Sequence, residues 1–394
     1  MQRVALSWLV YRLTSSEFLL GLVSFLGLIP VFVLSPFAGV IADRFQRLRI
    51  IVATQILAMA QALILSILVM TGNIGIEAIM MLSLFLGVIN AFDTPVRQAF
   101  TVEMIEKKDD LGNAIALNSA IFNAARLVGP SIAGILIAAI GEGPCFLING
   151  LSYIAVVGAL LRMKIVPGQI SGNDQKLLGG LKEGFSYAFG FSPIRYLLLL
   201  LFIVSVMGMP YMVLMPVFAR DILHGGPHTY GFLLAAAGCG ALAGALFLAA
   251  RTSVAGLERV IPRTAGLFGL AVIAFSFSNN QFLSMFFLVF AGFALMVEMA
   301  STNTLLQSIV DDDKRGRVMS MYVMCAMGAA PIGSLLAGFS ANLIGAPKTL
   351  CIGGICCLLG AVLFQRKLCE LKKMILPIYI EKGISDNDKI ELNS

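Results

Sequence analysis

The chain has 394 residues, of which 58% are hydrophobic and only 13% are charged, and its mean hydropathy is +0.91. Soluble domains carry about 25% charged residues, so the composition excludes a soluble globular protein and predicts an all-α polytopic membrane protein. The apolar blocks are too long for the short alternating strands of a membrane β-barrel. The net charge of +6 does not indicate nucleic-acid binding, because the basic residues are confined to particular loops.

The first apolar block, Val4–Thr14, is too short to cross a bilayer core of about 30 Å. We interpret it as the outer half of a first helix, and we expect either a start codon further upstream or a truncated gene. The later blocks, divided by charged residues, glycine and proline, predict eleven full spans. These spans are 17–42, 48–71, 76–97, 113–140, 144–162, 194–219, 230–250, 258–278, 281–305, 317–341 and 346–368.

The distribution of Lys and Arg predicts the orientation of these spans. Most of the 28 basic residues lie in alternate loops or in the C-terminal segment, whereas the opposite loops hold little more than Arg12, Arg220 and Lys348. Loops rich in Lys and Arg remain in the cytoplasm. We therefore expect a cytoplasmic C-terminus.

The longest hydrophilic interruption, about 163–193, divides the chain near its middle and contains an amphipathic stretch, Lys176–Phe189. A shift of 204 residues aligns 105–141 with 309–345 and places four glycines on glycines. This repeat predicts two parallel six-helix halves. The expected domains are an N-terminal bundle (1–164), a linker (165–193), a C-terminal bundle (194–369) and a cytoplasmic tail (370–394).

Two motifs resemble the major facilitator superfamily of transporters. The segment GVIADRFQRLR is similar to the signature between the second and third helices of that superfamily, although Gln46 replaces a common glycine. The fifth helix resembles the motif of proton-coupled exporters, with two glycines replaced by alanine. The matching positions are Gly39, Asp43, Arg44, Arg47 and Arg49 in the first motif, and Ala125, Gly129, Pro130, Ala133 and Gly134 in the second.

Longer segments resemble the enterobactin-exporter and macrolide-efflux-like branch of this superfamily. They are MQRVALSWLVYRLT, FDTPVRQAF, NAIALNSAIFNAARLVGP and RGRVMSMY. The resemblance implies the major facilitator fold in a bacterial inner membrane, and a small-molecule substrate with protons as the coupling ion. It implies no cofactor and no nucleic-acid partner, and we expect a monomer in the lipid bilayer.

A group of polar residues is expected at the cytoplasmic mouth. Asp93 and Arg97 share one face of the fourth helix at i, i+4 spacing and can pair. The family resemblance implies a gate in which Arg47 pairs with Asp93 and Asp43 faces the N-terminal end of the eleventh helix. The alternative is that Arg44, Arg47 and Arg49 only anchor the chain, which is our interpretation for Arg49.

Three polar residues inside spans are cavity or proton-coupling candidates. Arg126 shares a helix face with Asn123, and a charge at this depth usually faces a cavity and a partner. Glu298 is the only acidic residue in the interior of a span of the second half, with Ser301 and Thr302 on its face. Buried carboxylates can carry protons. Proton coupling by Glu298 and an ion pair with Arg126 both remain open.

Gly129-Pro130 predicts a bend and close helix packing, associated with export by the family resemblance. His224 and His228 indicate a solvated loop rather than a metal site, and no metal ligand set is predicted. The sequence contains no P-loop and no catalytic cluster, so we predict a non-enzyme, a proton-coupled exporter of a small, partly apolar, siderophore-like or drug-like compound. The alternatives are uptake, lipid flipping, and an inactive or receptor-like paralogue.

Overall fold

The protein is described here by a computed structural model. The structure describes residues 1–44, 46–103, 125, 128–163, 189–251, 253–311 and 314–381, without the side chains of 35–44, 99, 101–103 and 381. The predicted amphipathic stretch of the linker and the first half of the predicted span 113–140 lie outside these residues.

The chain is helical throughout the described residues, and ten of its helices are long and apolar enough to cross a membrane. The ends of the helices follow the charged residues, glycines and prolines that bound the predicted spans, usually within five residues. The first apolar block forms α1 (Gln2–Thr14), and a shorter apolar helix covers Val128–Ile140. The all-helical fold predicted from composition is therefore confirmed.

The chain divides into two compact units. The first consists of Met1–Asp174, Met212–Ala235 and Ser334–Ala346, and the second of Gln175–Tyr211, Ala236–Gly333 and Pro347–Ser394. The predicted domain boundaries at residues 164 and 193 stay a prediction.

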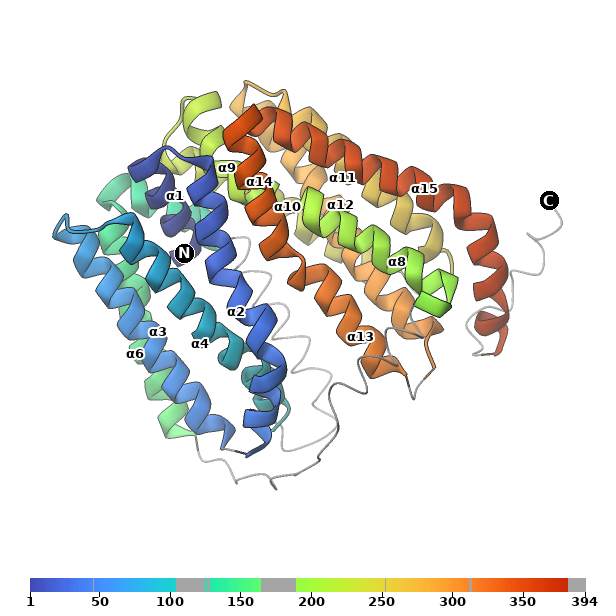
Figure 1. The fold of residues 1–394 in the computed structure, drawn as a ribbon, viewed down its shortest axis with the longest axis horizontal. Coiled ribbons are helices and arrows are strands. Elements are labelled where there is room, and N and C mark those ends of the chain that lie inside the picture. Colours follow the sequence, from blue (N-terminus) through green and yellow to red (C-terminus); the bar gives the residue numbers. More distant parts are fainter. Residues whose placement is uncertain are drawn as a thin grey trace. The chain divides into compact units, whose positions relative to one another are not determined.

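In the first unit, α2 packs along α4, and α3 packs between α4 and α6, as Figure 1 shows. Each of these helices is apolar around most of its surface, as expected for a segment surrounded by lipid and other helices. The short α1 contacts α2, α4 and α6. The bounds are α2 (Glu17–Arg44), α3 (Arg47–Met70), α4 (Ile76–Glu103) and α6 (Glu142–Arg162).

In the second unit, α11 lies along α12, and α12 also contacts α8 and α13. Two predicted spans have parts in both units: the span 194–219 is built from α8, η2, α9 and η3, and the span 317–341 is built from α13, η4 and α14. The η segments are π-turns, in which the backbone bond runs from residue i+5 to residue i. The bounds are α8 (Ser192–Ile203), η2 (Val204–Gly208), α9 (Tyr211–Val217), η3 (Phe218–Ile222), α10 (Pro227–Ala249), α11 (Leu257–Ser276), α12 (Gln281–Ile309), α13 (Arg315–Val323), η4 (Met324–Gly328), α14 (Ala330–Ile344) and α15 (Ala346–Glu381).

Two glycines at equivalent positions of the internal repeat have the same backbone conformation. Gly141 separates the helix Val128–Ile140 from α6 with φ of 83°, and Gly345 separates α14 from α15 with φ of 88°. Side chains strongly disfavour this left-handed region, so glycine is required at both junctions. The 204-residue offset found in the sequence is therefore repeated in the structure.

The last helix, α15, is longer than its predicted span, which ends at residue 368. It continues to Glu381 and reaches roughly 54 Å at 1.5 Å per residue. Leu368, Leu371, Ile375 and Tyr379 recur at helical spacing and are all buried, so the additional turns have an apolar face to pack. Lys372 Nζ lies 4.0 Å from Glu258 Oε1 at the start of α11.

Candidate functional site

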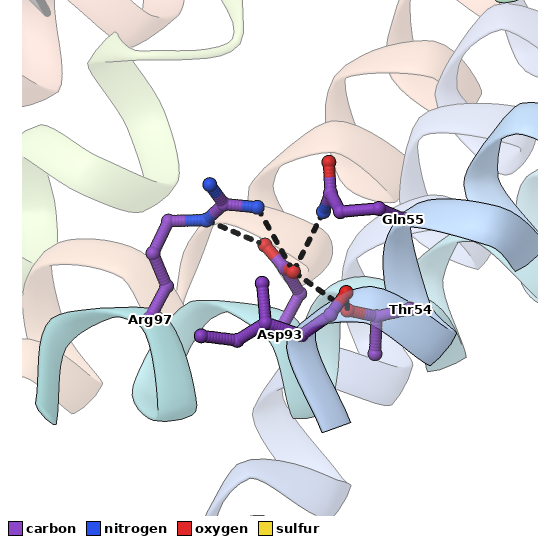
Figure 2. Close-up of polar contacts among 5 residues, drawn as sticks. Thr54, Gln55, Asp93 and Arg97 are labelled. Atoms are coloured by element: carbon purple, nitrogen blue, oxygen red, sulfur yellow. Dashed lines mark hydrogen bonds and ion pairs between the residues drawn. The ribbon is translucent and has the colours of Figure 1, made fainter. Parts of the chain in front are cut away.

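Asp93 of α4 is the centre of a polar cluster at one end of the first unit (Figure 2). Arg97 donates to both of its carboxylate oxygens, from Nε at 3.0 Å and from Nη2 at 3.1 Å. From α3, Thr54 Oγ1 donates to Asp93 Oδ1 at 2.7 Å and Gln55 Nε2 donates to the same oxygen at 2.8 Å. The four bonds fix the carboxylate and join the end of α4 to the start of α3.

The structure places the other predicted gate residues near this end of their helices. Arg47 begins α3, whereas Asp43 and Arg44 end α2 with side chains outside the described residues. The Asp93–Arg97 pair is confirmed. The predicted pairing of Arg47 with Asp93 and the role of Asp43 stay predictions.

Glu298 is fully buried in α12 of the second unit. Its Oε1 accepts a long hydrogen bond, 3.5 Å, from Thr302 Oγ1. Among the described residues, neither Glu298 Oε2 nor Ser301 Oγ has a hydrogen-bond partner. Tyr322 of α13 lies nearby and donates to the Met299 carbonyl at 3.0 Å. The Glu298 carboxyl group is therefore buried away from solvent, and its Oε2 atom accepts no hydrogen bond from the described residues.

The two other cavity candidates, Asn123 and Arg126, lie outside the described residues. Whether Arg126 pairs with Glu298 stays open for this reason.

The predicted motif of the fifth helix includes a close helix crossing. Ala133 is fully buried, and a Cβ on Gly134 would lie 2.7 Å from the Pro227 carbonyl oxygen and 2.8 Å from Gly231 Cα in α10. By contrast, a Cβ on Gly129 would have no atom of the described residues within 4 Å. Of the other motif positions, Ala125 is exposed and Pro130 is half-buried.

A second crossing of the same kind involves the repeat-equivalent glycine. A Cβ on Gly338 of α14 would lie 2.7 Å from the Glu17 carbonyl oxygen and 2.8 Å from Gly21 Cα in α2. Such backbone-to-backbone approach is possible only for small residues. The repeat-equivalent glycines Gly134 and Gly338 therefore each lie at a close helix crossing, one in each half of the chain.

Sequence analysis did not predict a buried amide chain that joins four helices of the first unit. Gln2 Nε2 of α1 donates to Gln61 Oε1 of α3 at 2.6 Å, and Asn149 Nδ2 of α6 donates to Gln2 Oε1 at 2.7 Å. Gln61 Nε2 donates to the Leu82 carbonyl of α4 at 3.2 Å. The only available signal was the occurrence of amide side chains within apolar blocks, where hydrogen-bonding partners are scarce.

Sequence analysis also missed a polar cluster at the C-terminal end of α1, which we call the α1–η3 cluster (Tyr11, Ser15, Arg220 and Asp221). The Tyr11 hydroxyl donates to the Asp221 carboxylate. Arg220 Nη1 donates to the Tyr11 carbonyl and to Ser15 Oγ, both at 3.1 Å. An adjoining open hollow is lined by Trp8, Arg12, Ile137, Ala138, Glu142, Gly226, Pro227 and His228.

Within the described part of the chain, no three His, Cys, Asp or Glu residues lie in an arrangement that could hold a metal ion. The polar side chains that come together among the described residues include carboxylates with hydroxyl, amide or guanidinium donors, and amides with one another.

Comparison with known proteins shows that the chain as a whole is similar to membrane transporters. A family model described as transmembrane secretion effector matches residues 1–376. The staphyloferrin A transporter of Staphylococcus aureus is 27% identical, with 90% of this chain and 88% of that protein covered. The multidrug efflux pump Tap of Mycolicibacterium fortuitum is 24% identical, with 93% and 92% covered. Macrolide efflux protein A of Streptococcus pyogenes is 22% identical, with 89% and 88% covered.

Solved transporter structures have the same fold. A nucleoside transporter NupG variant superposes with a TM-score of 0.71 at 14% identity, covering 92% of this chain and 94% of that one. A bacterial homologue of the human lysosomal transporter Spinster superposes with a TM-score of 0.70 at 16% identity, covering 96% and 94%. At this level of identity the likeness concerns the fold alone.

Proposed function

Because this chain belongs to the transmembrane secretion effector family of the major facilitator superfamily, we propose that it is a proton-coupled exporter. The transported compound is small and partly apolar, of siderophore-like or drug-like chemistry. Its relatives, which include a siderophore transporter and efflux pumps for macrolides and multiple drugs, support this substrate class and this direction. Transport follows alternating access across the bacterial inner membrane, with the C-terminus in the cytoplasm.

The observation that carries proton coupling is the burial of Glu298 with an unused carboxylate oxygen. An ionised carboxylate at membrane depth without a counter-charge costs several kcal/mol, whereas the protonated acid does not. A group in this position can take up a proton when it is closed off from water and release it when a conformational change admits water. That exchange is the step a proton-driven carrier requires.

The cluster around Asp93 is proposed as part of a cytoplasmic gate with Asp43, Arg44 and Arg47. Asp93 accepts hydrogen bonds from residues of both α3 and α4. Arg97 remains accessible to solvent, with 44% of its side chain exposed. An exposed ion pair is worth at most about 1 kcal/mol, so it can form and break in each cycle. The helix-5 motif with Gly129, Pro130 and Gly134 is proposed as a seal that favours export.

The test is transport by the purified full chain in proteoliposomes, with erythromycin and staphyloferrin A as probes and an imposed pH gradient. We expect the gradient to stimulate transport of at least one probe, and Glu298→Gln to remove that stimulation without lowering thermal stability. Glu77→Gln, at an exposed position in the first turn of α4, is the matched control.

Two results would overturn the proposal. If Glu298→Gln retains the stimulation by the pH gradient, Glu298 is not the coupling group. If Glu298→Gln destabilises the protein and Arg126→Gln restores it, the pair with Arg126 explains the carboxylate instead.

A further inference from the structure

The α1–η3 cluster and the Asp93 cluster lie at opposite ends of the first unit. The α1–η3 cluster is found where α1 ends, and Arg12 beside it pairs with Glu142 in the first turn of α6, Nε to Oε1 at 2.7 Å. Asp93 lies towards the other end, near the C-terminus of α4 and the start of α3. Because α3 and α4 run antiparallel, the C-terminus of α4 lies beside the start of α3, at the end of the bundle opposite to the α1–η3 cluster. A transport pathway that runs along these helices would have one cluster near each of its two ends.

The two clusters differ in which parts of the chain they join. The bonds to Asp93 connect α3 with α4, which are neighbours in sequence. The α1–η3 cluster instead connects residue 11 with residues 220 and 221, which lie more than 200 positions later in the chain. It is reinforced by stacking of Trp8 on Tyr230 of α10, with ring centroids 6.2 Å apart. The first helix is therefore fastened to Arg220, Asp221 and Tyr230 from the second half of the chain.

Arg220 and Asp221, which are adjacent in the π-turn η3, both contact Tyr11. In η3, Leu223 N donates to the Phe218 carbonyl at 2.9 Å, which is the wide i+5 pattern. The Arg220 guanidinium lies 5.5 Å from the centre of the Tyr11 ring and also binds the Tyr11 carbonyl, while Asp221 accepts from the hydroxyl. Wide turns of this kind occur mostly as single insertions at functional positions.

We propose that Tyr11, Arg220 and Asp221 form a latch that holds this end of the pathway shut and opens once in each transport cycle. By the distribution of Lys and Arg, this is the outer end. The contacts suit reversible closure because each uses a charged partner that water can solvate after separation. The latch rests on the alternating-access function proposed above, but not on proton coupling or on the identity of the substrate.

The test measures opening directly, without substrate or gradient. Ser7 lies one turn from Tyr11 on the same face of α1, is half-buried and contacts Tyr230 by a side-chain hydrogen bond, so its exposure is expected to increase when the latch opens. Ser7→Cys is introduced into the full chain, and its reaction with a membrane-impermeant maleimide is followed on intact cells. The label taken up by the same chain without Ser7→Cys is subtracted.

Tyr11→Phe removes only the hydroxyl, and Asp221→Asn removes only the charge. Loss of one charge-assisted hydrogen bond shifts a closed–open equilibrium by about tenfold, so we expect each variant to raise the labelling rate about tenfold. Tyr196→Phe in α8, outside the latch, should leave the rate unchanged. Thermal stability of each variant is measured alongside.

An unchanged labelling rate in both Tyr11→Phe and Asp221→Asn would overturn the latch. A lower thermal stability with no change in labelling would also overturn it, because the contacts would then be static. Neither result bears on proton coupling, which depends on Glu298→Gln and not on labelling. A failure of the latch and a failure of the proposed function are therefore distinguishable.

Discussion

The crossing at Gly134 gives the sharpest comparison that the structure allows. In Gly134→Ala, the new methyl group would lie 2.7 Å from the Pro227 carbonyl oxygen and 2.8 Å from Gly231 Cα. Both atoms are backbone, so a helix must move, and overpacking of this kind costs about 1–3 kcal/mol. Gly129→Ala, five residues earlier on the same helix, meets no atom of the described residues within 4 Å. Each change gains up to about 1 kcal/mol of helix propensity, and this gain cancels in the comparison.

We therefore expect Gly134→Ala to be about 1–3 kcal/mol less stable than Gly129→Ala. The assay is thermal unfolding of the two purified variants in the same detergent, heated at the same rate, with the wild-type chain as reference. Gly338→Ala should behave like Gly134→Ala, since its methyl group would lie 2.7 Å from the Glu17 carbonyl oxygen. If Gly134→Ala melts at or above the temperature of Gly129→Ala, the crossing is not closely packed and the reasoning is wrong.

The remaining predictions concern buried and half-buried polar contacts. Gln61→Leu leaves the buried side-chain amide of Gln2 without its acceptor and should lower the free energy of unfolding by about 1–3 kcal/mol. The control Gln307→Leu, at an exposed position, should change the free energy of unfolding little. Equal melting temperatures of the two variants would contradict this prediction. Asp93→Asn breaks the ion pair with Arg97 and should lower stability by less than about 1 kcal/mol. In the transport assay the same variant should be slowed at least several-fold if the cluster is a gate, and wild-type transport would remove Asp93 from that role.

Much of the helical layout could be predicted because membrane helices need long apolar runs and their ends need charges, glycine or proline. The break after Met70 and the break before Pro193 were found in this way. The predicted span ended at residue 368, where the apolar run gives way to a stretch with Arg366, Lys367, Lys372 and Lys373, whereas α15 continues to Glu381. Those charges lie outside the buried face of a continuing amphipathic helix, and the spacing of Leu368, Leu371, Ile375 and Tyr379 was the signal for it.

The candidate site was predictable only where the partners are close in sequence. Asp93 and Arg97 are one turn apart, so their pairing follows from helix geometry alone. Tyr11 and Asp221 are 210 residues apart, and no local pattern links them. Arg220 and Asp221 were counted as loop charges, because a π-turn leaves no periodic signal in an apolar stretch. A lone carboxylate such as Glu298 is visible in the sequence, but its deep burial, with no hydrogen-bond partner for Oε2 among the described residues, is a property of packing.

The π-turns also bear on how relatives of this protein can differ in length. Each of η2, η3 and η4 contains one residue more than the α-helical turn that could replace it. Loss of that residue would leave the helix unbroken, and because a π-turn takes up one extra residue in about the same rotation, the helix beyond it would keep its original faces. A single-residue deletion in a membrane helix, usually regarded as damaging, is therefore a tolerable event at these three places. At η3 the deletion would alter only the turn that carries Arg220 and Asp221, so the contact with Tyr11 can be lost through a change of length alone.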